Sequence, residues 1–241
     1  AIADHADDPV LAPYSIDRPM FETHIAALER RGFAFVSADA LAAALEGEAM
    51  LPRKAVLLTF DDCYADLLPT VREILAPRDI PALAFAVTGL AGGSNDWCAS
   101  AGGLPHRLLG WDDLRQLPAL GCDIGSHSRS HRDLTQLDAA GLGDEVAGSA
   151  DDFAANGLPR ATWFAYPFGA HDAHVRAAVQ AAGYRAGFAI ADLAATRRRN
   201  RHALPRIEML SSDTPWRFWF KTRFPTAATV LRQWPLRPSR D

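Results

Sequence analysis

The strongest constraint on the fold is the alternation of short strand-like stretches with longer helical ones. The strand-like stretches cover residues 33–36, 55–60, 83–87, 122–126, 162–166, 184–190 and 204–210. Helical periodicity fills most of the intervals between them. Repeated strand–helix units favour a mainly parallel sheet, because parallel neighbours must be joined by a crossover segment. We therefore predict one α/β domain over residues 1–241, a length that suits a single large domain.

The bulk composition restricts the classes of protein to which the chain can belong. Hydrophobic residues make up 49% of the sequence and charged residues 22%, which is enough to fill a substantial core. The net charge of −4 argues against general nucleic-acid binding. No apolar run approaches the roughly 18 residues of a membrane span. The N-terminus lacks the pattern of a signal peptide, so we expect a cytoplasmic protein, although removal of an export signal would leave the same sequence.

Candidate functional residues follow three of the expected strands at the points where those strands end. Asp61-Asp62 follows the second, His127 and His131 follow the fourth, and Pro167-Phe168 follows the fifth. Because the carboxyl ends of parallel strands meet at one edge of a sheet, where ligands bind, we expect these groups to share a rim. The alternative is that one Asp caps the next helix and the other carboxylate and both imidazoles are solvated.

Asp62, His127 and His131 have the composition of a catalytic zinc site, in which three protein ligands leave a position for water. Such ligands suit Zn²⁺, and Co²⁺ or Ni²⁺ would also fit them. In the zinc-binding helix motif a Glu base lies between the two histidines, whereas this chain has Ser128-Arg129-Ser130 there. The base must therefore come from another segment, and Asp61 is next to the expected metal-binding carboxylate.

In this order the segments resemble the motifs of the polysaccharide deacetylases of carbohydrate esterase family four. Residues 59–62 (Thr-Phe-Asp-Asp) resemble the first motif, residues 126–131 the second, and residues 166–169 (Tyr-Pro-Phe-Gly) the core of the third. The similarity extends over residues 54–190, with a weaker echo in residues 14–41. The resemblance implies a distorted (β/α) barrel with fewer than eight regular repeats. It also implies metal-dependent removal of acetyl groups from an N-acetylated amino sugar.

The resemblance assigns a role to each matched residue. The implied metal ligands are Asp62, His127 and His131, the implied general base is Asp61, and the implied substrate or oxyanion residues are Tyr166, Pro167 and Phe168. A backbone N–H near Phe168 would stabilise the tetrahedral oxyanion. Trp97, in the long polar stretch 89–105, either stacks on a sugar ring or anchors its own loop.

The chain departs from the family pattern at two motifs. The family usually has an Arg two residues before the proline of its third motif, and this chain has Ala165 there. Its fifth motif usually ends in the His that serves as general acid, and residues 204–208 contain no His. The closest match is therefore the subgroup that lacks both residues. A leaving amine still needs a proton, so another acid is required.

Two residues are predicted to fill these gaps. Some relatives that act on extracellular amino-sugar polymers have an N-terminal strand that ends in a histidine, which residues 2–5 (Ile-Ala-Asp-His) resemble. We therefore predict that His5 is the general acid, with His202 as its rival. We also predict that Arg206 takes the place of the missing Arg beside Asp61.

The C-terminal segment 197–241 is basic and aromatic. It contains 11 Lys and Arg against 3 Asp and Glu, and residues 216–224 hold five aromatic residues and three cations. One interpretation is that residues 216–224 pack on the barrel as a closing helix. The other is peripheral contact with an anionic membrane through residues 214–224.

The sequence thus predicts a metal-dependent hydrolase that removes N-acetyl groups from an amino sugar in a polysaccharide or glycoconjugate. Two alternatives stay open. The first is a hydrolase of the same type that acts on O-acetyl groups or small non-carbohydrate amides. The second is a catalytically silent carbohydrate-binding relative, against which Asp61 argues because binding alone needs no base.

Overall fold

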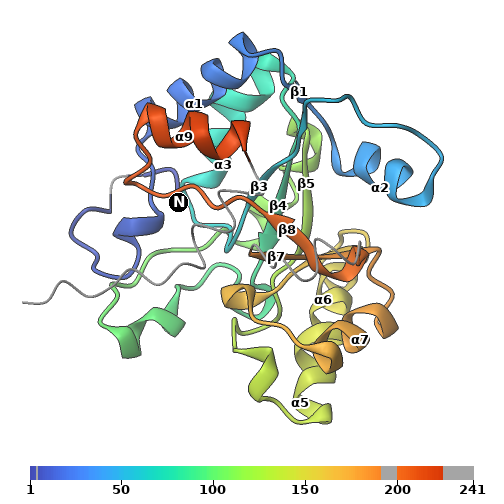
Figure 1. Cartoon of the computed structure of the whole chain (residues 1–241). Helices are drawn as coiled ribbons and strands as arrows, with labels where there is room; N and C mark the ends of the chain where they lie inside the picture. Colours follow the sequence, from blue (N-terminus) through green and yellow to red (C-terminus); the bar gives the residue numbers. More distant parts are fainter. Residues whose placement is uncertain (4, 191–199, 225–241) are drawn as a thin grey trace, which may run out of the picture.

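The computed structural model describes residues 1–3, 5–190 and 200–224. In these residues six parallel strands form one sheet whose spatial order follows the sequence. The strands are β3 (Leu58–Phe60), β4 (Ala82–Ala86), β5 (Cys122–Ser126), β6 (Trp163–Ala165), β7 (Ala186–Ile190) and β8 (Leu204–Arg206). The sheet curls, so that β7 and β8 run across the direction of β4 and β5 (Figure 1). The predicted α/β class, a distorted barrel with fewer than eight regular repeats, is confirmed.

Helices cover the sheet and connect its strands. They are α1 (Arg18–Arg30), α2 (Ala38–Glu46), α3 (Leu67–Thr70), α4 (Trp111–Leu114), α5 (Ala139–Gly143), α6 (Ser149–Ala155), α7 (Ala173–Ala181) and α9 (Pro215–Arg223). Several begin at a capping side chain that accepts from an otherwise unpaired N–H, as Asp17 does for α1 and Asp172 for α7. None of the helices in the described ranges combines the length and the apolar character that crossing a membrane would require.

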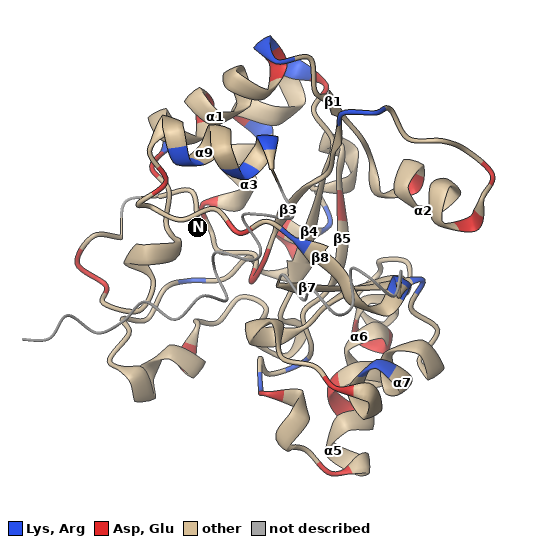
Figure 2. Cartoon of the chain, in the orientation of Figure 1, with Lys and Arg blue, Asp and Glu red and all other residues tan. Residues whose placement is uncertain are grey.

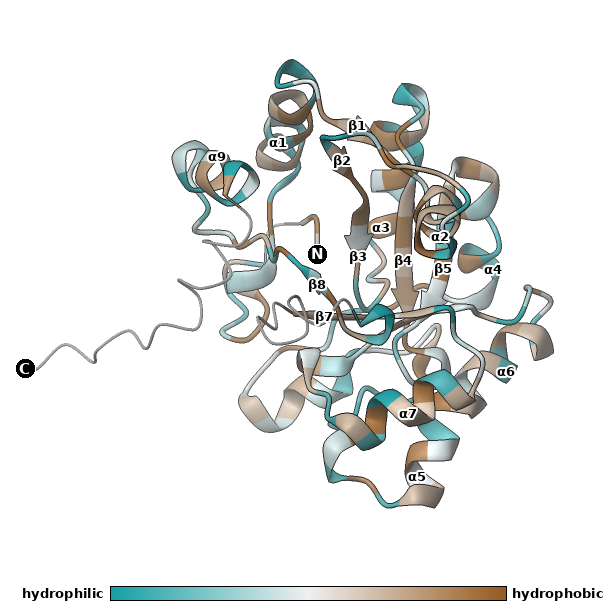
Figure 3. Cartoon of the chain, turned by 45° about the vertical axis from the view of Figure 1, so that its right-hand side comes forward, coloured by the Kyte–Doolittle hydropathy of each residue, from teal (hydrophilic) through white to brown (hydrophobic). Residues whose placement is uncertain are grey.

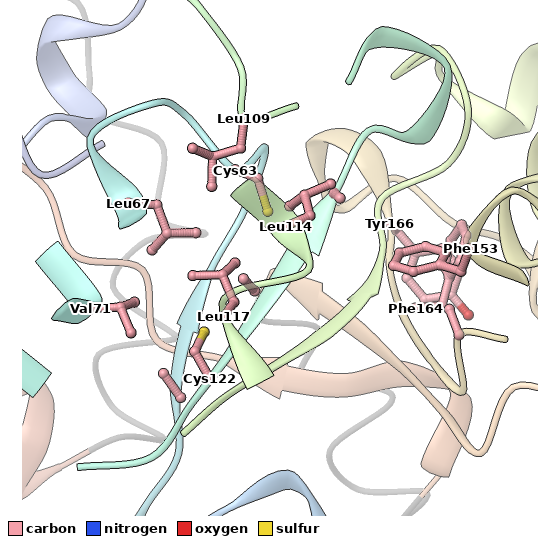
Figure 4. Packing of buried hydrophobic residues seen from close by; sticks show 14 of the residues in the cluster. Cys63, Leu67, Val71, Leu109, Leu114, Leu117, Cys122, Phe153, Phe164 and Tyr166 are labelled. Carbon is pink, nitrogen blue, oxygen red and sulfur yellow. The ribbon is translucent and has the colours of Figure 1, made fainter. Parts of the chain in front are cut away.

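The core lies on both faces of the sheet, as expected for parallel strands. All five residues of β4 are buried, and Figure 3 shows this strand as hydrophobic along its length. In Figure 4 the side chains of Cys63, Leu67, Val71, Leu109, Leu114, Leu117 and Cys122 form one group, and Phe153, Phe164 and Tyr166 form a second. The three cysteines are free and buried, so they contribute as small apolar residues rather than as disulfides.

Two local differences from the predicted elements affect the site. The expected strand 55–60 changes partners at Leu57: β2 (Ala55–Val56) pairs with β1 (Ala34–Phe35), and β3 pairs with β4. The expected helix 64–76 begins only at Leu67. The reason is that Tyr64, which the prediction placed at the start of the helix, forms a bridge with Leu108. It directly follows the left-handed backbone of Asp62 and Cys63, whose φ angles are 68° and 55°.

The C-terminal helix α9 lies beside α1 (Figure 1). Phe218 of α9 is buried and stacks on His24 of α1 with 4.0 Å between ring centroids. Thr222 accepts a hydrogen bond from Arg31 at 2.5 Å. This part of the basic aromatic segment therefore packs on the body of the protein, as one of its two interpretations required. Residues 197–199 and 225–241 of that segment lie outside the described residues.

Candidate active site

Asp62, His127 and His131 come together at the carboxyl ends of β3 and β5. Asp62 Oδ1 lies 3.5 Å from His127 Nε2 and 3.3 Å from His131 Nε2. Tetrahedral Zn²⁺ with bonds of about 2.0–2.1 Å would hold its ligand atoms roughly 3.3–3.4 Å apart. Asp62 Oδ1 is buried and has no hydrogen-bond partner, which is costly for an oxygen that carries charge. The donor set and its spacing therefore fit a divalent cation.

The two imidazoles are held with one nitrogen aimed at Asp62. His127 donates from Nδ1 to the carbonyl oxygen of Ala165 at 2.8 Å, which leaves Nε2 as the metal-facing nitrogen. Burial lowers the pKa of His127, and it lowers the pKa of His131 to about 4. Both rings are thus neutral at pH 7, the state in which imidazole binds metal. Trp97 stacks on His131 with 4.3 Å between ring centroids, and Phe168 meets it edge-on at 4.6 Å.

The loop between the two histidines is held by hydrogen bonds to its backbone. Glu145 is buried and accepts from the N–H groups of Arg129 and Ser130, at 2.9 Å each, and from the Ser130 hydroxyl. Ser128 Oγ accepts from the N–H of His131 at 3.1 Å. Ser128 and His131 have φ angles of 66° and 57°, which cost free energy in residues other than glycine. These bonds hold the loop in the strained conformation that aims His131 at Asp62.

Asp61 and Arg206 form a bidentate ion pair across the curled sheet. Arg206 Nη1 lies 2.6 Å from Asp61 Oδ1, and Nη2 lies 2.7 Å from Oδ2. Burial alone would raise the pKa of Asp61, but Arg206 and then His127 hold it below its usual value. Arg206 ends β8, so this strand supplies the guanidinium that Ala165 cannot. The predicted contact is present, whereas the catalytic role of the pair stays a prediction.

Asp62 has a different electrostatic setting from Asp61. Burial raises the pKa of Asp62 to about 6, and the Asp61 carboxylate adds to this rise. His127 acts in the opposite direction. A bound cation would oppose the rise, because it favours the charged carboxylate.

Of the third-motif residues, one side chain reaches the surface. Phe168 is 59% exposed and has a φ of 58°, beside His131. Tyr166 is fully buried and donates its hydroxyl to the carbonyl oxygen of His202 at 2.7 Å. The prediction that the Tyr166 side chain contacts substrate is therefore corrected: it is part of the core beside β7. Pro167 is also buried and offers no N–H to an oxyanion.

The two candidate acids occupy different surroundings. His202 is buried, and its Nε2 lies 3.1 Å from the carbonyl oxygen of Tyr184, so it is bound within the core. His5 is half-buried and packs on His106, with 4.2 Å between ring centroids. The segment that carries His5 contacts the region after β3, since the N–H of Ile2 donates to Asp66 at 2.5 Å. The acid role of His5 stays a prediction.

Sequence reasoning missed a carboxylate–histidine pair next to His5. His106 Nε2 lies 2.7 Å from Oδ2 of Asp8, although 98 residues separate the two in the chain. Both residues come from irregular segments, which carry no periodicity that would bring them together. A polar loop as long as residues 89–105 was the one available signal.

Comparisons with known proteins agree with this geometry. The family model for polysaccharide deacetylase matches residues 49–187. The YxkH protein of Bacillus subtilis (strain 168), whose assignment as a polysaccharide deacetylase is itself provisional, is 24% identical over 194 residues. That match covers 80% of this chain and 65% of YxkH, so the chain spans just under two thirds of this relative's length.

Solved structures share the fold. The deacetylase PplD of Streptococcus pyogenes, solved in complex with acetate, superposes with a TM-score of 0.71 at 22% identity, over 86% of this chain and 88% of PplD. IcaB of Ammonifex degensii superposes with a TM-score of 0.67 at 21% identity, over 89% of each chain. At these identities the likeness concerns the fold. Since the family model covers more than half of the sequence and includes Asp61, Asp62, His127 and His131, the chain belongs to the polysaccharide deacetylase family.

Proposed function

We propose that this protein is a metal-dependent hydrolase that removes N-acetyl groups from an amino sugar in a polysaccharide or glycoconjugate. The observation that carries the proposal is the spacing of Asp62, His127 and His131 beside the Asp61–Arg206 pair. Family membership supports it, as do the descriptions of two proteins with the same fold: PplD is a deacetylase in complex with acetate, and the protein from Aggregatibacter actinomycetemcomitans is a de-N-acetylase.

The residues of the chain have separable tasks in this reaction. Asp62, His127 and His131 would hold a divalent ion, which would supply Lewis acidity for a water molecule and an acetyl carbonyl. Asp61 accepts the proton of the attacking water, and Arg206 fixes the orientation of both carboxylate oxygens. Because this pair keeps the pKa of Asp61 low, Asp61 is a weak base and can take a proton only from an acidified water.

Substrate placement and departure of the amine need further groups. Phe168 and Trp97 flank His131 and offer ring faces against which a sugar can lie. His5 donates the proton that turns the leaving nitrogen into an amine. The alcohol of an ester leaves without protonation more readily than the amine of an amide does. A general acid such as His5 therefore favours the N-acetyl proposal over the O-acetyl proposal.

Acetate release tests the proposal. Purified protein reloaded with Zn²⁺, Co²⁺ or Ni²⁺ should release acetate from N-acetylglucosamine oligomers, and chelator should stop the release. Asp61→Asn is the catalytic control. Release from O-acetylated sugars alone would replace the N-acetyl proposal with the esterase alternative. Retained metal without release from any amide or ester would favour the carbohydrate-binding alternative.

We also propose that the chain belongs to the subgroup that lacks the third-motif Arg and the fifth-motif His. The contact between Arg206 and Asp61 supports this, because it fills the position near the base from β8. The corresponding test is functional replacement. Ala165→Arg combined with Arg206→Ala should recover part of the kcat that Arg206→Ala loses if the two positions are equivalent, and no recovery would argue against the equivalence.

A third proposal concerns α9 and an anionic membrane surface. Trp216 is 66% exposed and stacks on the exposed Trp219 with 4.8 Å between ring centroids. Figure 2 shows basic and no acidic positions on this helix, of which Arg217 and Arg223 are exposed. Exposed indoles next to cations suit the interface of an anionic bilayer. Trp216→Ser with Trp219→Ser should weaken sedimentation with phosphatidylglycerol vesicles, whereas Tyr14→Ser, an exposed aromatic outside α9, should not.

A further inference from the structure

Asp8 is a buried carboxylate whose hydrogen-bonding capacity is filled. It is 1% exposed and accepts from the N–H groups of Val10, Leu11 and Leu104 at 2.8–3.0 Å. Its fourth donor is Nε2 of His106 at 2.7 Å. These donors outweigh the effect of burial and lower the pKa of Asp8 to about 2, so the carboxylate is charged throughout the physiological range.

The charge of Asp8 determines which proton His106 carries. A carboxylate can only accept, so Nε2 of His106 must hold a hydrogen and donate it. The N–H of His106 is held as well, because it donates to Asn95 Oδ1 at 2.6 Å. With its ring nitrogen and its backbone both engaged, the His106 imidazole cannot turn without breaking the contact with Asp8. His106 is therefore a fixed ring in an otherwise irregular loop.

This fixed ring faces His5 and is linked to the metal site. Its centroid lies 4.2 Å from that of His5, and Tyr64 meets it edge-on at 6.4 Å. Tyr64 is buried, and the nearby Asp62 carboxylate adds to the effect of burial in raising the pKa of its hydroxyl. Asn95, which holds the backbone of His106, also contacts the Tyr64 hydroxyl at 3.5 Å. Contacts thus run from His5 through His106 to Tyr64, which lies two residues after the proposed metal ligand Asp62.

We propose that Asp8 and His106 are positioning residues for His5: Asp8 fixes the imidazole of His106, and His106 holds His5 where the leaving amine must be protonated. This inference rests on the proposed function, in which His5 is the general acid. Neither residue belongs to a matched motif. The pair would support His5, which takes the place of the general acid that the chain lacks at its fifth-motif position.

The charges around His5 determine how its acidity should respond. Burial lowers the pKa of His5, and His106 lowers it further. The carboxylates of Asp66 and Asp8 act in the opposite direction. Removing the imidazole of His106 should therefore raise the pKa of His5. A general acid works in its protonated form, so the alkaline limb of the kcat profile should move to higher pH while kcat itself falls from lost orientation.

A double-mutant cycle tests whether His106 acts through His5. We expect His5→Ala to lower kcat by about 10²-fold and His106→Gln by about tenfold with KM little changed. In the His5→Ala background, His106→Gln should have no further effect. A tenfold loss in both backgrounds would overturn the inference, because His106 would then act independently of His5. His174→Gln, on the exposed face of α7, is the matched control and should leave kcat unchanged.

A second readout needs neither substrate nor activity. The His5 imidazole can be titrated by NMR in the wild type and in His106→Gln, and its pKa should be higher in the variant. An unchanged pKa in a folded variant would overturn the coupling between the two rings. His106→Phe keeps a ring against His5 but removes the donor to Asp8. It should lose kcat as His106→Gln does, and wild-type kcat in His106→Phe would exclude a role for the Asp8 contact.

These outcomes separate the inference from the proposal on which it rests. Absence of deacetylation in the metal-loaded wild type would contradict the proposed function, while the NMR comparison would still report whether His106 controls His5. Wild-type kcat in His5→Ala would remove the acid role of His5 and the positioning role with it. If His5→Ala lowers kcat and His106→Gln lowers it equally in both backgrounds, the acid role of His5 would stand and only the positioning role would be overturned.

Discussion

Asp62 and Asp8 are two carboxylates of the candidate site, the first with a buried Oδ1 and the second 1% exposed, and their surroundings differ in a way that separates their tasks. Asp8 accepts from three backbone N–H groups and from His106, and its pKa is lowered to about 2. Asp62 has an oxygen without any partner, and its pKa is raised to about 6. Asp8 is already satisfied by the protein, whereas Asp62 is arranged for a positive charge that must come from elsewhere.

The same contrast holds for the segments that carry them. The metal side of the site is built on the ends of β3, β5 and β8, where the sheet holds the backbone. The proposed acid side is built on residues 5–11 and on the loop that contains Asn95 and His106, where side-chain hydrogen bonds replace strand pairing. Strand ends thus bring the ligands together through topology, and the loops depend on particular pairs of side chains.

The largest effect should follow from removing a metal ligand. Asp62→Asn loses the charge that the cation requires, so bound metal should fall below stoichiometry and kcat/KM should fall by about 10³-fold or more. Elemental analysis and acetate release measure the two effects. Asp112→Asn, at a 92% exposed side chain, is the control. Full metal content and activity in Asp62→Asn would show that the proposed contrast between the two carboxylates is wrong.

A smaller loss is expected from the ion pair beside the metal site. Arg206→Lys keeps the charge but cannot make two parallel hydrogen bonds with Asp61, so kcat should fall by about 10- to 100-fold with metal content unchanged. Arg185→Lys, which alters an exposed pair with Glu46, should have no such effect. If Arg206→Lys bound less metal but kept its kcat, Arg206 would support the metal ligand Asp62 rather than the base Asp61.

The loop that carries His131 should affect metal affinity alone. Glu145→Gln replaces a charged acceptor of two backbone N–H groups with a neutral one, and we expect roughly tenfold weaker metal binding. Competition with a chelator of known affinity measures this change. Asp144→Asn, which alters the exposed neighbour that pairs with Arg129, should change it less. Equal effects of both variants would mean that the charge of the helix, rather than the loop contact, controls the affinity.

The parts of the site on strand ends could be predicted from the sequence. Asp61, Asp62, His127 and His131 each follow a short strand-like run, and parallel strands converge at one edge. Arg206 was predicted because the family usually has an Arg beside the base at the position that Ala165 occupies here. Tyr166 was assigned to the substrate or oxyanion group from the resemblance of its motif, which does not reveal that the Tyr166 side chain is buried in the core.

Other features depend on contacts that no local pattern encodes. Tyr64 pairs with Leu108 of a distant loop, a contact that the residue types do not reveal, so the sequence predicted a helix that starts too early. The pairing of Asp8 with His106 joins two irregular segments, and neither residue type requires the other. Such long-range side-chain pairs appear only when the whole chain is placed in space.

The smallest expected effect is on the free energy of unfolding, in which Asp8 and Asp62 should differ. The pKa of Asp8 is depressed to about 2 from an ordinary value of 3.8, so its charged form stabilises the folded state above about pH 4, and this stabilisation disappears as the pH falls toward 2. Asp8→Asn should therefore lower the free energy of unfolding at pH 7 by about 1–3 kcal/mol, and the difference from the wild type should shrink between pH 4 and pH 2.

Asp62→Asn should show the opposite behaviour in metal-free protein at pH 7, because it removes a buried charge that lacks donors, and stability should be unchanged or higher. Urea unfolding across this pH range, with the exposed Asp7→Asn as control, measures both. A constant deficit for Asp8→Asn at all pH values would mean that the amide lost packing rather than charge, and Asp8 would then differ from Asp62 only in shape.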